Sequence, residues 1–331
     1  MPKERIATMT MFNGYPVKIA GTGRYIPEKV RTNSYFEEFL DTNDEWIRTR
    51  TGIIERHVAA EGEECSDLAA KAALDALKDA GISAEDIDVI IVSTNTPEMQ
   101  CPCISGIVHG KIGATKAAVF DVFAGCTGSL AAIMTAVSGI ATGVWNNALI
   151  IAAESFNSIV DWTDRNTCIL FGDGAGACVL TRSTEDGPKF IAAEMTADGS
   201  KYDLITIMRE EGRSPSPVLS MKGQDVFRFV SSHMPQFVKG FCEKNGVLPQ
   251  DIDFWVLHQA NARIIDSLFR RLSVSQDRTY MNMFKYGNTS TASLLITLDE
   301  VVKAGHFKRG AKIMFTAFGA GMTFGSMLYE A

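Results

Sequence analysis

The strongest constraint on the fold is an internal repeat. Residues 81–92 and residues 246–257 follow the same pattern, which starts at a glycine, passes through a short turn containing acidic residues and ends in an apolar run. A glycine after a helical pattern is typical of a helix C-terminus, and a bounded apolar run of this length is typical of a buried strand. The unit of helix end, turn and strand occurs twice, which indicates a duplicated α/β fold.

Apolar runs and helical periodicity alternate along both halves of the chain. In the first half we expect strands at residues 17–20, 87–93, 117–123, 148–153 and 177–181, with helices at 66–80, 104–112 and 127–142. In the second half we expect helices at 223–245, up to 272 and at 289–304, and strands up to 257, at 279–283, at 312–317 and up to 328. Such alternation predicts a parallel sheet wrapped in helices. Two βαβαβ halves, residues 17–182 and 183–331, would together form a five-layered αβαβα structure.

Residues 198–222 interrupt this alternation. The segment carries alternating charges and the run Ser214-Pro215-Ser216-Pro217, so we expect it to be irregular. Long segments without regular structure are uncommon in compact domains and are often functional. We therefore expect these residues to cover a substrate.

The composition narrows the possible classes of function. The chain has 331 residues, of which 46% are apolar, and a formal net charge of −7. This charge disfavours a nucleic-acid partner, although it does not exclude a local basic patch. The sequence has no run near the ~20 apolar residues of a membrane span, and residues 1–16, whose role is left open, lack the apolar core of a secretory signal. Seven cysteines scattered through apolar runs favour reduced thiols, so a cytoplasmic protein is expected.

Three residues whose side chains could take part in a reaction lie at matched positions of the repeat. Cys126 stands between the strand predicted at 117–123 and the next helix, His258 follows the repeated strand, and Asn288 occupies the position equivalent to Cys126. Open α/β sheets place their sites at the carboxyl ends of strands. The start of a helix would stabilise a thiolate at Cys126 and lower the pKa of its thiol. An imidazole and a carboxamide can both donate hydrogen bonds to one oxyanion.

Each of the three residues also has an ordinary structural explanation. Cys126 could be a small buried hydrophobe, His258 could cap the following helix, and Gly-Asn-Thr is common in turns. Cysteine, histidine and asparagine also occur together in papain-like hydrolases, but the fold pattern and the residue order argue against that class. Three such residues at matched strand ends favour a site over packing.

The chain resembles the thiolase-fold condensing enzymes, and specifically the 3-oxoacyl-[acyl-carrier-protein] synthase III family. The resemblance extends from about Val17 to Glu330 and rests on residues 42–53, 164–165 with 170–176, 258–261, 287–290 and 318–326 and on the surroundings of Cys126. It implies a thiolase-like five-layered fold, a homodimer and an acyltransferase that starts fatty-acid synthesis.

The resemblance also implies the reaction. Cys126 would take an acyl group from acyl-CoA, and backbone amides of Cys126 and of the turn Gly319-Ala320-Gly321 would hold the thioester oxygen. His258 and Asn288 would stabilise the enolate that forms when malonyl-acyl-carrier protein loses carbon dioxide. No metal and no redox cofactor would be needed, because decarboxylation drives the new carbon–carbon bond.

Binding residues follow from the same resemblance. Trp46 would stack on the CoA adenine, with Arg165 on its other side and Arg50 near the phosphates, although Trp46 could also be a core aromatic. Cys101 would line the far end of the acyl pocket across the dimer, where a thiol in place of a bulkier side chain predicts a roomier pocket. Four arginines would form a face that binds an acidic carrier protein: Arg228, Arg263, Arg270 and Arg271. The alternative is that they form an ordinary solvated basic face.

Several alternatives to this predicted function stay open. One is a specialised starter synthase of polyketide or signal-molecule biosynthesis with a longer acyl donor. Another is an acyltransferase to oxygen. A third is a non-catalytic scaffold partner, which would not need the thiol of Cys126. Residues 172–177 match a loose dinucleotide-binding pattern, yet a strand rather than a helix follows them. Cys101, Cys103 and His109 lack a second ligand pair at zinc spacing, so we expect no metal site.

Overall fold

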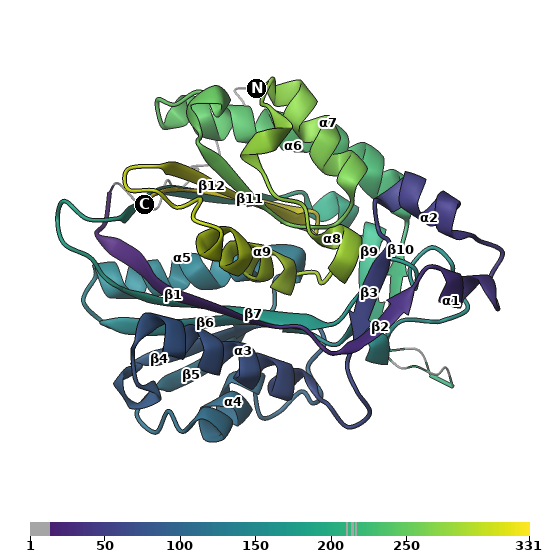
Figure 1. Ribbon diagram of the computed structural model, residues 1–331, viewed down its shortest axis with the longest axis horizontal. Coiled ribbons are helices and arrows are strands. Elements are labelled where there is room, and N and C mark those ends of the chain that lie inside the picture. Colours follow the sequence, from purple (N-terminus) through teal and green to yellow (C-terminus); the bar gives the residue numbers. More distant parts are fainter. Residues whose placement is uncertain (1–13, 210, 213–214, 216) are drawn as a thin grey trace.

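The computed structural model describes residues 14–209, 211–212, 215 and 217–331, and it arranges them in five layers (Figure 1). Two sheets are separated by a central pair of helices and covered on their outer faces by further helices, as predicted for a thiolase-like fold. The outer pair on the first sheet is α3 (Cys65–Ala80) and α4 (Ile104–Ile112), the central pair is α5 (Gly128–Ala141) and α9 (Ala292–Lys303), and the pair on the second sheet is α6 (Gly223–Lys244) and α7 (Ala262–Leu272).

The first sheet has the strand order β1-β7-β6-β4-β5. Its strands are β1 (Val17–Tyr25), β4 (Val89–Ser93), β5 (Ala118–Val122), β6 (Asn147–Glu154) and β7 (Gly174–Arg182). β4 runs parallel to β5 and β6, whereas β7 is antiparallel to both β6 and β1. The prediction of a wholly parallel sheet was therefore wrong, because the chain re-enters this sheet directly through β7 instead of through a helical crossover.

The second sheet has the order β11-β12-β13-β8, from β8 (Lys189–Ala197), β11 (Phe254–Leu257), β12 (Lys312–Gly319) and β13 (Thr323–Glu330). The strand predicted at 279–283 is reduced to one bridge between Thr279 and Trp255, and the short helix α8 (Met283–Tyr286) follows it. That prediction was wrong. Short apolar runs can take either conformation, and here Asn282 accepts the amide hydrogens of the next turn and starts a helix.

The repeat that the sequence shows is also present in the structure. Gly81 and Gly246, both with φ of +65°, follow α3 and α6, and each leads through a 3₁₀ turn into a buried strand, β4 or β11. The aspartate before each strand makes an equivalent hydrogen bond. Asp88 Oδ2 accepts the N–H of Asn147 at 3.0 Å, and Asp253 Oδ2 accepts that of Lys312 at 2.8 Å. Each carboxylate thereby fixes the start of the neighbouring strand.

Residues 198–222 are more regular than predicted. They contain a hairpin of β9 (Ile205–Met208) and β10 (Val218–Met221), paired antiparallel. Each of these strands has only four residues, which is too short to give a clear periodic signal beside the neighbouring charges and prolines. Ser214 and Ser216, in the predicted Ser-Pro run, lie outside the described residues, as do residues 1–13 of the leader. Beside the hairpin lie β2 (Lys29–Thr32), β3 (Glu55–Val58), α1 (Ser34–Glu37) and α2 (Asp44–Thr51).

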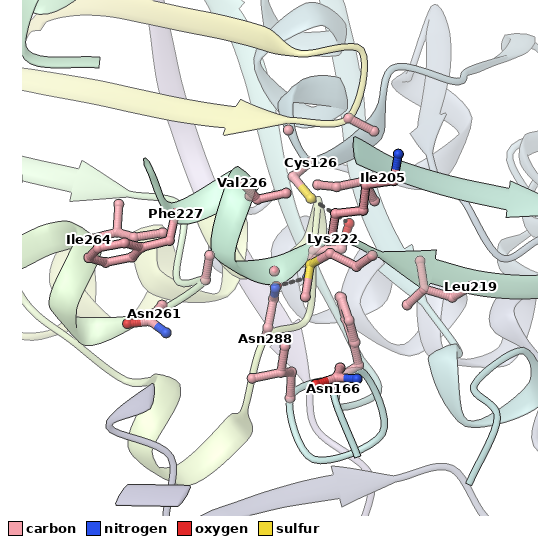
Figure 2. Close-up of a pocket in the computed structure, with 18 of the residues that line it drawn as sticks. Cys126, Asn166, Ile205, Leu219, Lys222, Val226, Phe227, Asn261, Ile264 and Asn288 are labelled. Carbon is pink, nitrogen blue, oxygen red and sulfur yellow. Dashed lines mark hydrogen bonds between the residues drawn. The ribbon is translucent and has the colours of Figure 1, made fainter. Parts of the chain in front are cut away.

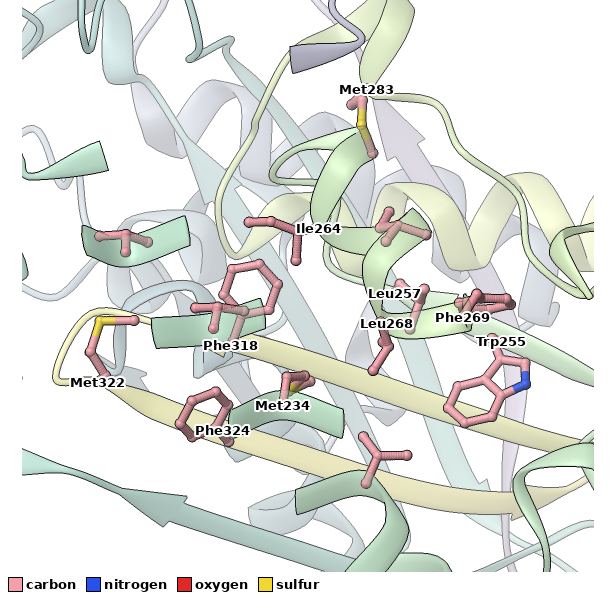
Figure 3. Packing of buried hydrophobic residues seen from close by; sticks show 14 of the residues in the cluster. Met234, Trp255, Leu257, Ile264, Leu268, Phe269, Met283, Phe318, Met322 and Phe324 are labelled. Carbon is pink, nitrogen blue, oxygen red and sulfur yellow. The ribbon is translucent and has the colours of Figure 1, made fainter. Parts of the chain in front are cut away.

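Three apolar clusters hold the layers together. One lies between the outer helices α3 and α4 and the first sheet, the second surrounds the central helices, and the third lies between the second sheet and α6 and α7. Figure 3 shows the third, in which Leu268 and Phe269 of α7 pack near Trp255 and Leu257 of β11. Burying this apolar surface on both faces of each sheet favours the layered arrangement.

The strands of the first sheet come from residues 17–182 and those of the second from residues 189–330. The division into halves at residues 182 and 183 stays a prediction. Within the part of the chain that is described, we find no helix both long and apolar enough to pass through a membrane.

Candidate active site

A cavity of about 900 Å³ lies where loops from both halves meet. Cys126, His258 and Asn288, which are separated by up to 162 positions in the chain, all line it. Figure 2 shows Cys126 and Asn288 among its lining residues, together with Val226 and Phe227 of α6. The hairpin β9–β10 contributes Ile205, Ile207, Leu219 and Met221, so the segment predicted to cover a substrate does line this cavity.

Cys126 lies in a tight turn between β5 and α5. The turn, Gly125–Thr127, is a single 3₁₀ turn, and Gly125 has a φ of +57°, which favours glycine. The following residue, Gly128, approaches Ser93 so closely that a Cβ there would lie 2.1 Å from Ser93 Oγ. The two glycines thus allow Cys126 to lie at the start of α5, as the sequence predicts.

The ionisation of Cys126 departs from the prediction. Burial raises the pKa of its thiol to about 12, and the charge of Glu154 raises it further, while a hydrogen bond from Ser290 lowers it. The sulfur contacts the cavity, but protein atoms surround the rest of the side chain, and the helix start does not compensate for that loss of hydration. A thiol with this pKa is protonated at neutral pH, so forming the thiolate requires a proton acceptor.

His258 follows β11, where its backbone N–H donates to Thr316 O at 3.0 Å. The ring is 2% exposed and packs edge-on against Phe318, and burial lowers its pKa to about 3, so it is neutral. Nδ1 lies 2.7 Å from Ser293 Oγ, whose hydroxyl can donate either to Nδ1 or to Ser290 O at 2.8 Å. When the hydroxyl donates to Nδ1, the neutral ring carries its proton on Nε2, which can then donate a hydrogen bond.

Asn288 lies in the loop after α8 and not at the end of a strand, so the predicted equivalence with Cys126 was wrong in this respect. Its backbone is tied to the first half, because its N–H donates to Leu170 O at 2.8 Å and its carbonyl accepts from Gly172 N–H at 3.1 Å. The side-chain Oδ1 accepts the N–H of Ser290 at 2.8 Å. This bond orients the carboxamide, so its Nδ2 is the end that is available to an oxyanion.

The predicted oxyanion turn, Gly319-Ala320-Gly321, connects β12 to β13 beside Cys126. A Cβ at Gly319 would lie 2.7 Å from the backbone nitrogen of Cys126. Any larger residue at 319 would push the turn away from the nucleophile. Ala320, which interrupts the glycine run, faces Gly125 across the same contact.

Trp46, Arg50 and Arg165 lie together at the mouth of the cavity. Asn43 caps α2 by accepting the N–H of Trp46 at 2.8 Å, which fixes the start of the helix that carries the indole. The guanidinium carbon of Arg165 lies 5.0 Å from the centre of the Trp46 ring, and that of Arg50 lies 6.0 Å away. Trp46 is partly buried, and it packs against the apolar cluster that also includes residues of α6 and α7 while it lines the cavity.

The four arginines of the predicted carrier-protein face are exposed on α6 and α7, which pack against each other. Arg228 and Arg263 also line the cavity mouth, and Arg263 stacks over Phe227 at 5.0 Å. Arg270 and Arg271 lie in the last turn of α7, farther from the mouth.

Cys101 is exposed just before α4 and is not among the residues that line this cavity. Its predicted role in the pocket of a second subunit stays a prediction. Among the residues that the structure describes, no three His, Cys, Asp or Glu side chains are grouped so that they could hold a metal ion.

The sequence analysis missed a buried polar group beneath Cys126. Ser290 Oγ lies 3.2 Å from Cys126 Sγ and 3.2 Å from Asn95 Nδ2, and Asn95 in turn contacts Glu154. One signal was visible, since Glu154 is a charged residue that directly continues an apolar strand. Its proximity to Cys126 depends on pairing between β4 and β6, which the sequence alone did not reveal.

Comparison with known proteins agrees with this geometry. Residues 120–199 and 242–331 match models described as 3-oxoacyl-[acyl-carrier-protein (ACP)] synthase III and its C-terminal part. Beta-ketoacyl-[acyl-carrier-protein] synthase III of Clostridium acetobutylicum is 44% identical over 95% of this chain and 98% of that protein. The protein of the same name from Caldanaerobacter subterraneus is 43% identical over 94% of this chain and 97% of its own length.

Solved structures give the same result. The crystal structure of 3-oxoacyl-[acyl-carrier-protein] synthase III from Aquifex aeolicus superimposes with a TM-score of 0.90 at 41% identity, covering 95% of this chain and all of the other. A priming β-ketosynthase from a polyketide biosynthetic pathway also has a TM-score of 0.90, at 30% identity and 99% coverage of both chains. With similarity over nearly its whole length and a thiol, an imidazole and a carboxamide around one cavity, the chain belongs to the 3-oxoacyl-[acyl-carrier-protein] synthase III family of condensing acyltransferases.

Proposed function

We propose that this protein condenses an acyl-CoA primer with malonyl-acyl-carrier protein and releases a 3-oxoacyl-acyl-carrier protein, the first condensation of fatty-acid synthesis. The observation that carries the proposal is the meeting of Cys126, His258 and Asn288 in one cavity whose mouth presents Trp46 and Arg165. A nucleophile for a thioester and two donors for an oxyanion are the groups that such a reaction requires.

In the first half-reaction the sulfur of Cys126 attacks the carbonyl carbon of acyl-CoA. Negative charge then develops on the carbonyl oxygen, and the turn Gly319-Ala320-Gly321, which touches the backbone of Cys126, would supply amide donors to it. The CoA thiolate leaves and the acyl group stays on Cys126. Trp46 and Arg165 would bind the adenine through stacking, and Arg50 would bind the phosphates.

In the second half-reaction the malonyl group loses carbon dioxide, and its thioester carbonyl becomes an enolate. His258 Nε2–H and Asn288 Nδ2 would donate hydrogen bonds to the enolate oxygen. The imidazole has this orientation when the Ser293 hydroxyl donates to Nδ1, and the carboxamide has it because Oδ1 accepts the backbone N–H of Ser290. The enolate carbon attacks the acyl-Cys126 thioester. Decarboxylation drives this step, so the proposed reaction needs neither a metal nor a redox cofactor.

Incubation of the protein with malonyl-acyl-carrier protein and a ladder of straight-chain acyl-CoAs should give 3-oxoacyl-acyl-carrier protein, detected by mass. We expect donors longer than acetyl-CoA to be used, because Cys101 is small. A protein that acylates itself but forms no condensation product with any donor would contradict the proposed reaction. Condensation only with long donors would instead favour the specialised starter synthase, an alternative that the likeness to the priming ketosynthase also supports.

An acidic carrier protein would dock on the arginines of α6 and α7. Arg263→Glu with Arg270→Glu should weaken the use of malonyl-acyl-carrier protein by about tenfold at low salt, while acylation by acyl-CoA stays nearly unchanged. The loss should shrink as salt rises, since exposed charges are screened over about 8 to 10 Å at physiological ionic strength. The measurement is kcat/KM for each substrate across a salt series.

The matched control reverses two charges elsewhere. Lys308 and Arg309 are exposed in the connection between α9 and β12, and Lys308→Glu with Arg309→Glu changes the net charge by the same amount. Equal carrier-protein kinetics in the two double variants at low salt would show that the arginines of α7 form only a solvated face.

We further propose a cytoplasmic homodimer. β5 forms an edge of the first sheet, and the neighbouring Phe123 is 72% exposed, so a second copy could pair along this edge and cover an apolar side chain. Cys101 of one subunit would then line the acyl pocket of the other. The seven cysteines are free thiols, which supports a reducing compartment, and the net charge of −7 argues against a nucleic-acid partner.

A further inference from the structure

Glu154 is a buried carboxyl group that the reaction described above leaves without a role. It ends β6 and is fully buried. Its Oε1 accepts from Asn95 Nδ2 at 2.5 Å, and its Oε2 accepts from the backbone N–H of Asn95 at 3.0 Å and from the Thr96 hydroxyl at 2.8 Å. These partners are neutral. A buried carboxyl without a cationic partner is costly to keep ionised, so it readily exchanges a proton.

Ser290 connects this carboxyl group to the nucleophile. Its Oγ lies 3.2 Å from Cys126 Sγ, and Asn95 Nδ2 donates both to this Oγ and to Glu154 Oε1, which brings the hydroxyl next to the carboxyl group. The nearby Ser290 hydroxyl lowers the pKa of Glu154. The amide nitrogen of Asn95, 3.2 Å from Oγ, can only donate, so the proton of the Ser290 hydroxyl is free to face either the sulfur or the carboxylate. Ser290 also has a φ of +49°, a left-handed conformation that is unfavourable for residues with a side chain and that concentrates at functional sites.

We propose that Glu154 accepts the proton of the Cys126 thiol and that the Ser290 hydroxyl passes it between them. The S–H bond breaks as its proton moves to Ser290 Oγ, and the proton already on Oγ moves to the Glu154 carboxylate. The products are a thiolate and a neutral carboxylic acid. Ser290 contacts the reacting sulfur, whereas Glu154 acts through Ser290. The inference rests on the proposed function only for the identity of the electrophile, acyl-CoA.

The protons balance over the full cycle. Cys126 thiolate attacks acyl-CoA, the carbon–sulfur bond to CoA breaks, and the CoA thiolate leaves and takes a proton from solvent. Glu154 stays neutral beside the acyl-Cys126 thioester, where a buried charge would be unfavourable. After the enolate attacks, Cys126 leaves as a thiolate, and Glu154 returns its proton through Ser290. One proton is taken from solvent for each condensation.

The acidities favour Glu154 over His258 as the acceptor. Burial raises the pKa of Glu154 to about 7, whereas burial lowers the pKa of His258 to about 3. A thiol with a pKa of about 12 transfers its proton far more readily to the stronger base. Two other titratable groups lie close to Glu154. The Cys65 thiol, 3.4 Å from Thr94 Oγ1, is held protonated by burial, and Asp173 precedes the residue that pairs with Glu154.

The test is the rate of Cys126 alkylation by iodoacetamide between about pH 5.5 and 9.5, which requires no acyl-CoA. In the wild-type protein the rate should rise up to about pH 7 and then form a plateau, because the charge of ionised Glu154 opposes the further ionisation of Cys126 and the thiolate then forms by transfer of the thiol proton to Glu154. In Glu154→Gln the plateau should vanish, and the rate should climb about tenfold per pH unit. In Ser290→Gly the plateau should remain but at a lower rate, because the hydroxyl that hydrogen-bonds to the sulfur is missing.

Both variants should fold. Glutamine keeps the shape of Glu154 without a buried charge, and glycine suits the positive φ of Ser290, so Ser290→Gly should melt no lower than the wild type while its plateau rate falls. Asp173→Asn is the matched control. It neutralises a second fully buried carboxyl, whose pKa is raised by burial to about 6 and which accepts the backbone N–H groups of Ala59 and Asn157. Its alkylation profile should keep the plateau.

Acylation by acyl-CoA separates this inference from the proposed function. At pH 7.5 the rate of acyl transfer to Cys126 should fall about 10²-fold in Glu154→Gln and in Ser290→Gly, a usual loss for a proton acceptor. Wild-type protein that shows the plateau but takes no acyl group would overturn the proposed function and leave the relay intact. Identical pH profiles in wild type, Glu154→Gln and Ser290→Gly would overturn the relay, whatever the acylation result.

Discussion

Acyl-CoA should add the mass of one acyl group to the peptide that contains Cys126, and Cys126→Ala should abolish both this adduct and condensation. The reason is positional: among the seven cysteines, Cys126 is the one that lines the cavity, at the start of a helix and against Gly319. Without the sulfur no covalent intermediate can form, so the expected loss is complete. The measurement is peptide mass spectrometry after incubation with acyl-CoA alone.

The matched control for this experiment is Cys168→Ala. Burial also raises the pKa of Cys168 to about 12, and Cys168 belongs to the loop that supports Asn288, but it does not line the cavity. Its removal should leave the adduct on Cys126. An acyl group found on Cys168 or Cys101 in the wild-type protein would contradict the assignment of the nucleophile.

The layered fold could be predicted because each layer has a strong local signal. α4 was predicted at 104–112 and is found at those residues, since its apolar positions recur at helical spacing and Gly113 ends it. Residues 279–283 lacked such a signal. A short apolar run fits a strand or a helix, and the outcome depended on Asn282 and on packing against β3, which are tertiary effects.

The candidate site could be predicted in its residues but not in its electrostatics. The sequence places Cys126 at a helix start and so suggests a lowered pKa, yet burial decides the opposite direction, and burial is a property of the assembled layers. Similarly, Glu154 lies 28 residues from Cys126 in the chain, and only the pairing of β4 with both β5 and β6 brings the two near each other through Asn95 and Ser290.

His258→Ala and Asn288→Ala should separate the two half-reactions. In the proposed reaction both side chains donate to the enolate oxygen, whereas acyl transfer to Cys126 uses the backbone amides of the turn at 319–321. Condensation should therefore fall by roughly 10²-fold or more in each variant, the usual cost of losing one oxyanion donor. Acylation should keep a substantial fraction of its rate. Rapid-quench measurement of the acyl-enzyme and of the 3-oxo product distinguishes the two steps.

The pH dependence of these variants tests the charge state of the imidazole. Because burial lowers the pKa of His258 to about 3, the ring is neutral throughout the working range, and its loss should reduce condensation by the same factor at pH 6 and at pH 8. A cationic histidine would instead make the factor larger at pH 6. Asn288→Asp provides a matched comparison, because it keeps the side-chain shape, and Oδ1 can still accept the N–H of Ser290. It replaces the donor with a carboxylate that repels the enolate, so condensation should fall at least as far as in Asn288→Ala. Equal losses of acylation and condensation in all three variants would contradict this division of roles.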